Sequence, residues 1–282
     1  YGFNKNLKRT AGTMRQFIVE TPLDSDGCIG IQGKKYHYLN SVLRVKCGDM
    51  IYARLLDGSL QQMTVAKIVS CEKKIILQAA GKLNCNDSIS QAAPVLEKPK
   101  AEIYLFQFEA KPPKMDLIIR QATECGVCGI IPVEGEFCQK GNIESARKKS
   151  ESGDERWQRI VTEARQQSGS PVETKVFYSV SVEEACGFWS SLQAEHKAAL
   201  VFYERSDGTK SIYNALKNAD VIKKENAKIA VAVGAEGGIS VQEISIMKES
   251  GFIPVHFDTN ILRCETASLY GIAALQTVLN GE

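Results

Sequence analysis

The stretch that decides the fold is AVAVGAEGGIS, residues 230–240. An apolar run stops at three glycines and a carboxylate, and a new segment begins at Ser240. Such a run predicts a strand buried on both faces, which is typical of a parallel sheet. Glycines let a ligand approach bare backbone, whereas Glu236 would repel a diphosphate. The pattern favours a loop for a cationic or neutral ligand, with a plain tight turn as the alternative.

Strand and helix patterns alternate on both sides of this stretch, from about residue 100 to the C-terminus. Alternation of this kind predicts a mainly parallel α/β sheet. We expect strands at Ile103–Phe108, Gly129–Val133, Ala198–Tyr203, Ile229–Val233 and Ile253–Phe257. We expect helices at Lys114–Glu124, Asp154–Gln167, Val241–Glu249 and Thr266–Leu279.

The first part of the chain has a different pattern of short β-branched or alternating segments. It predicts strands at Gln16–Glu20, Met50–Leu55, Gln62–Val69 and Lys74–Gln78, with one helical piece at Lys34–Leu43. These elements predict a small β-barrel at 14–85. A polar stretch with prolines predicts a linker at 86–99, before a second domain at 100–282. Residues 1–13 lack periodicity and form an extension of unknown role.

Charge is distributed unevenly between these parts. Residues 1–85 hold 13 Lys and Arg against 6 Asp and Glu, whereas the remainder holds 22 against 27. A basic front module predicts a polyanionic partner, and a solvated basic face is the alternative. Nine cysteines without regular spacing and no secretory signal predict free thiols and a cytoplasmic protein. The CxxC at 125–128 lacks further ligands, so we expect no metal.

A second polar loop, DTNILRCETA at 258–267, follows another predicted strand. In an open parallel sheet, ligands bind beyond the carboxyl ends of the strands. The apolar pair Ile261-Leu262 is suited to an adenine edge, and S-adenosylmethionine is one cationic ligand that fits both loops. An ordinary helix entry, with Arg263 and Glu265 in a surface ion pair, is the alternative. Neither GxGxxG nor a Walker lysine is present, which disfavours a nucleotide-dependent oxidoreductase.

Six ordered blocks of sequence together resemble a known family. They are MRQF (14–17), HYLNSVLRVKCGD (37–49), KMDLIIRQATECGV (114–127), RWQRIVTEARQQSG (156–169), VGAEGGISVQE (233–243) and ILRCETASLYGIAAL (261–275). The chain resembles the ribosomal RNA small subunit methyltransferase E family, within the SPOUT superfamily of S-adenosylmethionine-dependent RNA methyltransferases. The resemblance covers Met14 to the C-terminus.

This resemblance implies a fold, an activity and a cofactor site. It implies a PUA-like RNA-binding β-barrel followed by a parallel-sheet α/β domain with a trefoil knot. It also implies a homodimer that methylates N3 of a uridine in 16S (small-subunit) ribosomal RNA, as a step of rRNA processing in ribosome biogenesis. The implied cofactor-binding residues are Glu204, Val233, Gly234, Ala235, Glu236, Gly238, Phe257, Asn260, Ile261, Leu262, Thr266 and Ala267.

Several positions depart from the family pattern. Ala235 stands for a proline, Asp258 for a glycine and Ser170 for an arginine. Asn260 likewise stands for an arginine, and Gln121 for a lysine. Asp258 and Asn260 raise an alternative function, a non-catalytic RNA-binding protein whose cofactor site has decayed.

The remaining hypotheses concern catalysis, RNA and assembly. A guanidinium is most effective where negative charge develops in a dry site, so we expect Arg263 to stabilise the uridinate, or alternatively to clamp the knot. Glu265 or water is the expected proton acceptor. Candidate RNA contacts are Arg15, Lys34, Lys35, Arg44, Lys46 and Arg165. Small residues on the last helix predict either a dimer contact or core packing: Ala267, Gly271, Ala273 and Ala274.

Overall fold

The structure is a computed structural model that describes residues 16–79, 99–141, 143–144, 147, 155–205 and 208–281. The expected extension, most of the expected linker and the candidate RNA contact Arg15 lie outside these residues. The chain divides into two compact units. The N-terminal unit comprises Tyr1–Glu97 with Gln166–Pro171, and the C-terminal unit comprises Lys98–Arg165 with Val172–Glu282.

The C-terminal unit is built on a parallel sheet. The strands are β6 (Ala101–Phe108), β7 (Gly129–Glu134), β8 (Lys175–Val176), β9 (Val180–Ser181), β10 (Lys197–Phe202), β11 (Ala227–Val233) and β12 (Phe252–Val255). Their order is β12-β10-β11-β6-β7-β8, with β9 also pairing with β7, and every pair is parallel. Burial of β11 on both faces explains its continuous apolar sequence, because no residue of Ile229–Val233 exceeds 2% exposure.

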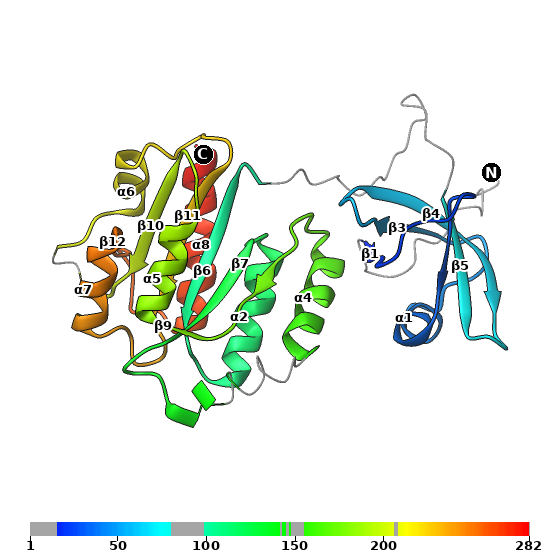
Figure 1. Cartoon of the computed structure of the whole chain (residues 1–282), viewed down its shortest axis with the longest axis horizontal. Helices are drawn as coiled ribbons and strands as arrows, with labels where there is room; N and C mark the ends of the chain where they lie inside the picture. The colour runs from blue at the N-terminus through cyan, green and yellow to red at the C-terminus, as the bar shows by residue number, and fades with distance from the viewer. Residues whose placement is uncertain are drawn as a thin grey trace, which may run out of the picture. The chain divides into compact units, whose positions relative to one another are not determined.

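Helices cover both faces of this sheet (Figure 1). One face carries α2 (Pro112–Glu124), α4 (Glu155–Ser168), α6 (Ile212–Asn218) and α8 (Cys264–Asn280). The other face carries α5 (Val182–Ser191) and α7 (Val241–Glu249). The predicted α/β alternation is therefore confirmed as a three-layer arrangement. Among the described residues, no helix is both long and apolar enough to cross a membrane.

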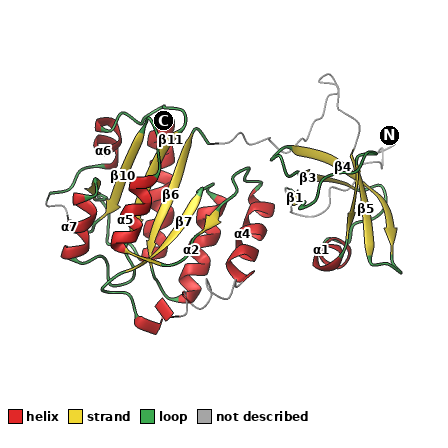
Figure 2. Ribbon diagram, in the orientation of Figure 1, coloured by secondary structure: helices red, strands yellow, loops and turns green. Residues whose placement is uncertain are grey.

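The N-terminal unit is a curled five-stranded sheet with one helical segment (Figure 2). It contains β1 (Phe17–Ile18), β2 (Cys28–Ile31), α1 (Gly33–His37), the π-helical turn η1 (Tyr38–Val42), β3 (Met50–Arg54), β4 (Leu60–Val69) and β5 (Lys74–Ala79). The order is β1-β3-β4-β5-β2, antiparallel except for β1 with β3. Strand side chains such as Phe17 and Met63 fill its core together with Leu39 of η1.

Residues 166–171 belong to the N-terminal unit, although they comprise the end of α4 and the residues directly after it. Gln16 Nε2 donates a hydrogen bond to the Ser170 carbonyl at 2.9 Å. Arg54 Nε donates to Gln16 Oε1 at 2.7 Å, and Arg54 Nη2 donates to the Gly169 carbonyl at 3.4 Å. The domain boundaries expected from the sequence placed 166–171 in the second domain. Their contacts to the N-terminal unit join positions more than a hundred residues apart, which no local pattern predicts.

Several short elements were not predicted from the sequence: β2, β8, β9, α5 and α6. Strands of two residues are too short to show any alternation. The helix α5 did have a local signature, since Ser181 and Glu184 form a capping box at its start. Its Trp189 and Cys186 pack into the core on the α5–α7 face of the sheet.

Candidate active site

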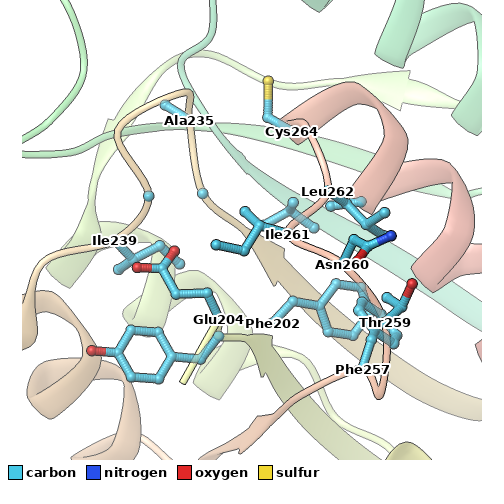
Figure 3. Close-up of a pocket in the computed structure, with 15 residues that line it drawn as sticks. Phe202, Glu204, Ala235, Ile239, Phe257, Thr259, Asn260, Ile261, Leu262 and Cys264 are labelled. Atoms are coloured by element: carbon cyan, nitrogen blue, oxygen red, sulfur yellow. The ribbon is translucent and has the colours of Figure 1, made fainter. Parts of the chain in front are cut away.

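A pocket lies at the carboxyl edge of the C-terminal sheet. Because β10, β11 and β12 are parallel neighbours, the loops that follow them meet at one edge. The pocket contains about 690 Å³ of space, counting the part open to solvent. Figure 3 shows the side chains of the three loops gathered around it, among them Glu204, Ala235 and Ile261.

Most of the predicted cofactor-binding residues line this one pocket. They are Glu204, Val233, Gly234, Ala235, Gly238, Phe257, Asn260, Ile261, Leu262 and Ala267. Sequence reasoning missed five further lining residues, which are Phe202, Tyr203, Ile239, Thr259 and Cys264. Glu236 and Thr266 were predicted but do not line the pocket.

The conformation of the glycine loop after β11 requires residues that have no side chain. A Cβ atom on Gly234 would lie 2.8 Å from the backbone carbon of Gly238, closer than real Cβ contacts allow. Gly238 has a φ of +80°, in the left-handed region, and pairs with Ala235 in an isolated bridge. The loop therefore doubles back on itself and leaves main chain exposed toward the pocket. A Cβ on Gly238 would lie 3.4 Å from Glu204 Oε2, so that carboxylate stands beside the bare backbone.

A buried glutamine ties this loop to the last helix. Gln107 is fully buried at the end of β6, and its Nε2 lies 3.3 Å from both the Val233 and the Gly234 carbonyls. Ser268 in α8 donates its hydroxyl to Gln107 Oε1 at 2.6 Å. A buried amide is costly unless its hydrogen bonds are made, so this network holds the loop and helix at one separation. The sequence signal was a polar residue after the apolar run 103–106 of the same strand.

Two pocket-lining aromatic side chains, Phe202 and Phe257, pack beside α8. The ring of Phe202 packs against Phe257 with centroids 4.8 Å apart, and Phe257 packs against Tyr270 at 4.9 Å. Gly271 leaves room for this arrangement, because a Cβ there would lie 1.8 Å from Phe202 Cε2. The small size of Gly271 therefore serves packing within the chain, whereas Ala273 on the same helix is exposed.

The carboxylate of Glu236 faces the start of α2. Its Oε1 accepts a hydrogen bond from the Lys111 backbone N–H at 3.3 Å and lies 3.5 Å from Lys114 Nζ. Lys114 Nζ also lies 3.0 Å from Glu265 Oε2. The Glu236 carboxylate therefore has a structural role among the glycines, because it anchors the tip of the loop to the start of α2. Sequence reasoning did not identify Lys114, because its two partners lie far away in the chain.

The ionisable groups in this cluster shift one another's pKa values. Burial lowers the pKa of Lys114, but the hydrogen bond to Glu265 and the charges around it outweigh burial and leave that pKa raised. Burial alone raises the pKa of Glu265, yet its hydrogen bonds, including those from Cys264 and Lys114, leave it lowered. Burial, followed by the hydrogen bond to Glu265, raises the pKa of the Cys264 thiol to about 12.

Arg263 occupies the N-cap position of α8 between two pocket-lining residues, Leu262 and Cys264. Its side chain is exposed, and within the described part of the chain it has no hydrogen bond or ion pair. The alternative in which Arg263 pairs with Glu265 at the surface is therefore not observed, because Glu265 pairs with Lys114. Among the described residues the guanidinium has no partner, so it is available to a substrate.

The substituted position Asp258 does not enter the pocket. Its side chain is 98% exposed, and its Oδ1 lies 3.2 Å from His256 Nε2. His256 Nδ1 in turn lies 2.6 Å from Thr209 Oγ1. Asn260 lines the pocket without closing it. These two substitutions therefore leave the space for a ligand intact.

The candidate RNA contacts of the N-terminal unit differ in availability. Lys34, Arg44 and Lys46 are exposed around α1 and the turn after it. Lys35 is half-buried; its Nζ lies 2.8 Å from Glu20 Oε1 and donates to the Ile18 carbonyl at 3.0 Å. Arg165 belongs to the C-terminal unit, in the last turn of α4.

Comparisons with known proteins agree with this site. The model of the RNA methyltransferase domain family matches residues 96–276. The ribosomal RNA small subunit methyltransferase E 2 of Borreliella burgdorferi is 29% identical over 273 residues, covering 94% of this chain and 98% of that protein. Its counterpart from Buchnera aphidicola is 28% identical, over 93% of each chain.

A solved structure gives the same result. The ribosomal RNA small subunit methyltransferase E of Neisseria gonorrhoeae, bound to S-adenosylmethionine, superposes with a TM-score of 0.70 at 25% identity. The alignment covers 94% of this chain and 97% of that one. From the family match, the full-length relatives and the shared fold, the chain belongs to the RNA methyltransferase domain family, as a member of its small subunit methyltransferase E group.

Proposed function

We propose that the pocket after β10, β11 and β12 binds S-adenosylmethionine, the cofactor of this ribosomal RNA methyltransferase, which methylates N3 of a uridine in 16S rRNA. The observation that carries the assignment is that Gly234 and Gly238 line the pocket, where glycines present main chain alone. Glu204 adds a carboxylate at Gly238, which complements a ligand carrying sulfonium and ammonium charges. Exposed Ile261 and half-buried Leu262 offer apolar surface for an adenine.

We assign the pocket-lining residues predicted from the sequence to cofactor binding, together with Phe202 and Cys264. Glu236 and Thr266 take a supporting role instead, since neither lines the pocket. When bound, S-adenosylmethionine supplies an electrophilic methyl group on its sulfonium. The chain itself has to orient the uridine and stabilise the charge that appears on it, because an in-line displacement depends mainly on positioning.

Arg263 is the residue we assign to the uridine. Loss of the N3 proton spreads negative charge onto the uracil oxygens, and a guanidinium stabilises such charge through charge-assisted hydrogen bonds. Arg263 lies beside the pocket with no partner of its own among the described residues. That freedom supports a role toward substrate more than a structural clamp.

We propose water as the acceptor of the N3 proton. Glu265 is the alternative, but its carboxylate is hydrogen-bonded to Lys114 and Cys264. An ion-paired carboxylate whose pKa is lowered takes up a proton less readily. Its contacts suit the support of α8, and no metal is needed for the transfer.

The N-terminal unit is proposed as the RNA-binding module. Residues 14–85 would form a PUA-like barrel, supported by the curled sheet and its antiparallel order, with 86–99 as the linker to the catalytic domain. Exposed Lys34, Arg44 and Lys46 are the favoured phosphate contacts, with Arg15, Lys35 and Arg165 as secondary ones. Such contacts are sequence-independent and weaken as salt rises.

We further propose a SPOUT-type trefoil knot, a homodimer and a cytoplasmic location. The strand order supports the knot, because α8 follows edge strand β12 yet packs against α2, α6 and β11. Exposed apolar side chains on α2 and α8, Leu117 and Tyr270, support a dimer contact. A decayed, purely RNA-binding protein is less favoured, since the substituted positions leave the pocket open.

Two measurements on the full-length protein test this proposal. Isothermal titration with S-adenosylmethionine should give saturable heat for the wild type and for Arg263→Ala alike. Methylation of 16S rRNA, followed by mass mapping of modified nucleosides, should fall about 10²- to 10³-fold in Arg263→Ala. Arg263→Lys keeps the charge but loses the planar fork, so we expect an intermediate rate. No heat with the wild type would refute the cofactor site, and an undiminished Arg263→Ala rate would refute the role of Arg263.

A further inference from the structure

We propose that Lys114 is a positioning residue. Its ammonium group pairs with Glu236 and Glu265 at the same time, and so keeps the glycine loop and the start of α8 at the separation that cofactor binding requires. The inference rests on the proposed function of the pocket and goes further, because it assigns a role to a residue outside the pocket. Lys114 does not line the pocket, so it is not a catalytic residue.

The geometry joins three separate segments of the chain. Lys114 lies in the first turn of α2, Glu236 at the tip of the glycine loop, and Glu265 in the first turn of α8. The Nζ atom lies 3.5 Å from Glu236 Oε1 and 3.0 Å from Glu265 Oε2. The three side chains are 27%, 29% and 15% exposed, so water screens the pairs only in part.

Each of the two glutamates directly follows a pocket-lining residue in the sequence. Glu236 follows Ala235, and Glu265 follows Cys264, both of which line the pocket. The same loop and helix are already tied more deeply by Gln107 and Ser268. Lys114 therefore supplies a second tie nearer the surface, which prevents the loop tip and the helix start from separating.

The direction in which cofactor affinity changes when Lys114 is removed distinguishes a positioning role from a purely electrostatic one. S-adenosylmethionine carries two positive groups and one negative group, so it is a net cation. If Lys114 acted only through its charge, its removal would tighten cofactor binding. If it holds the loops, its removal leaves two carboxylates facing each other without a cation, the loops separate, and cofactor binding weakens.

The pH profile gives a second signature. The groups facing this point are Glu236 from the glycine loop, Glu265 and the Cys264 thiol from α8, and Lys114 from α2. In Lys114→Met, repulsion raises the pKa of one carboxylate. Its protonation as pH falls from about 7 to about 5 then removes the repulsion, so affinity should recover. The double variant Lys114→Met/Glu236→Gln should lack that pH dependence.

The test is isothermal titration of full-length variants with S-adenosylmethionine at two pH values. At about pH 7 we expect Lys114→Met to bind at least about fivefold more weakly and Lys114→Arg to stay within about twofold of wild type. Lys248→Met, an exposed lysine in the last turn of α7, serves as the matched control and should bind normally. Circular dichroism establishes that each variant is folded.

The outcomes are distinguishable. If the wild type gives no heat, the proposed cofactor site fails, independently of Lys114. If the wild type binds and Lys114→Met binds equally well or more tightly, the clamp is wrong. Should Lys114→Met not fold, Glu265→Gln removes the shorter ion pair with little change of shape. Its affinity must then fall, and an unchanged value would equally overturn the proposal.

Discussion

Substitution of Gly271 by alanine gives a sharp test of how the pocket wall is built. The added Cβ would lie 1.8 Å from Phe202 Cε2 and 2.4 Å from its Cζ. Ordinary contact begins at about 3.4 Å, so the ring has to withdraw by about 1.6 Å. Phe257 packs against one side of the ring, and the pocket, which Phe202 lines, is open on another. We therefore expect the ring to move into the pocket.

Two opposing terms set the change in stability. Overpacking a well-packed core costs about 1–3 kcal/mol, while alanine stabilises a helix interior by about 1 kcal/mol relative to glycine. The free energy of unfolding should therefore fall by about 0–2 kcal/mol. A ring displaced into the pocket should weaken S-adenosylmethionine binding at least about tenfold, which corresponds to about 1.4 kcal/mol.

Urea unfolding and isothermal titration measure the two effects separately. Gly187→Ala is the matched control, because Gly187 is an exposed residue inside α5 with no atom within 4 Å of an added Cβ. It should gain about 1 kcal/mol in stability and bind the cofactor normally. Adding Phe202→Leu to Gly271→Ala should restore part of the lost affinity. A Gly271→Ala protein with wild-type affinity would refute the packing argument.

Three further predictions follow from the same structure. Gly234→Ala should abolish S-adenosylmethionine binding in titration, because its Cβ would meet the Gly238 backbone at 2.8 Å, whereas Gly141→Ala, with nothing within 4 Å, should bind normally. Iodoacetamide at about pH 8 should alkylate exposed Cys47 and Cys71 in the folded protein but spare Cys264, since a pKa raised to about 12 keeps that thiol protonated. Peptide mass mapping decides this, and equal labelling of Cys264 would contradict it. The triple variant Lys34→Gln/Arg44→Gln/Lys46→Gln should bind rRNA more weakly and reduce the salt dependence of binding by about 0.7–0.9 in slope per lost phosphate contact. Its cofactor affinity should not change, and an unaltered salt slope in filter binding would exclude these residues as contacts.

Sequence patterns predicted the elements whose cause is local. The apolar run ending at Val233 required a doubly buried strand, and the glycines after it required a tight loop with exposed backbone. The small residue at 271 was ambiguous, because a glycine in a helix suits a partner chain or a neighbouring ring equally well. The structure shows that Gly271 makes room for the ring of Phe202 in the same chain. The missed strands β8 and β9 show the limit of periodicity, because each has only two residues.

The sequence by itself determined the parallel α/β class and the two glycine- and polar-rich loops, because strand burial and backbone freedom are properties of short segments. Most of the residues that line the pocket were instead implied by the resemblance to a family. Only the tertiary structure decided which side chains meet. The partners of Glu236 and Glu265, the tie between Gln107 and Ser268, and the membership of residues 166–171 in the N-terminal unit all depend on segments far apart in the chain. No local pattern encodes such contacts, since they exist only after the sheet has brought its strand ends together.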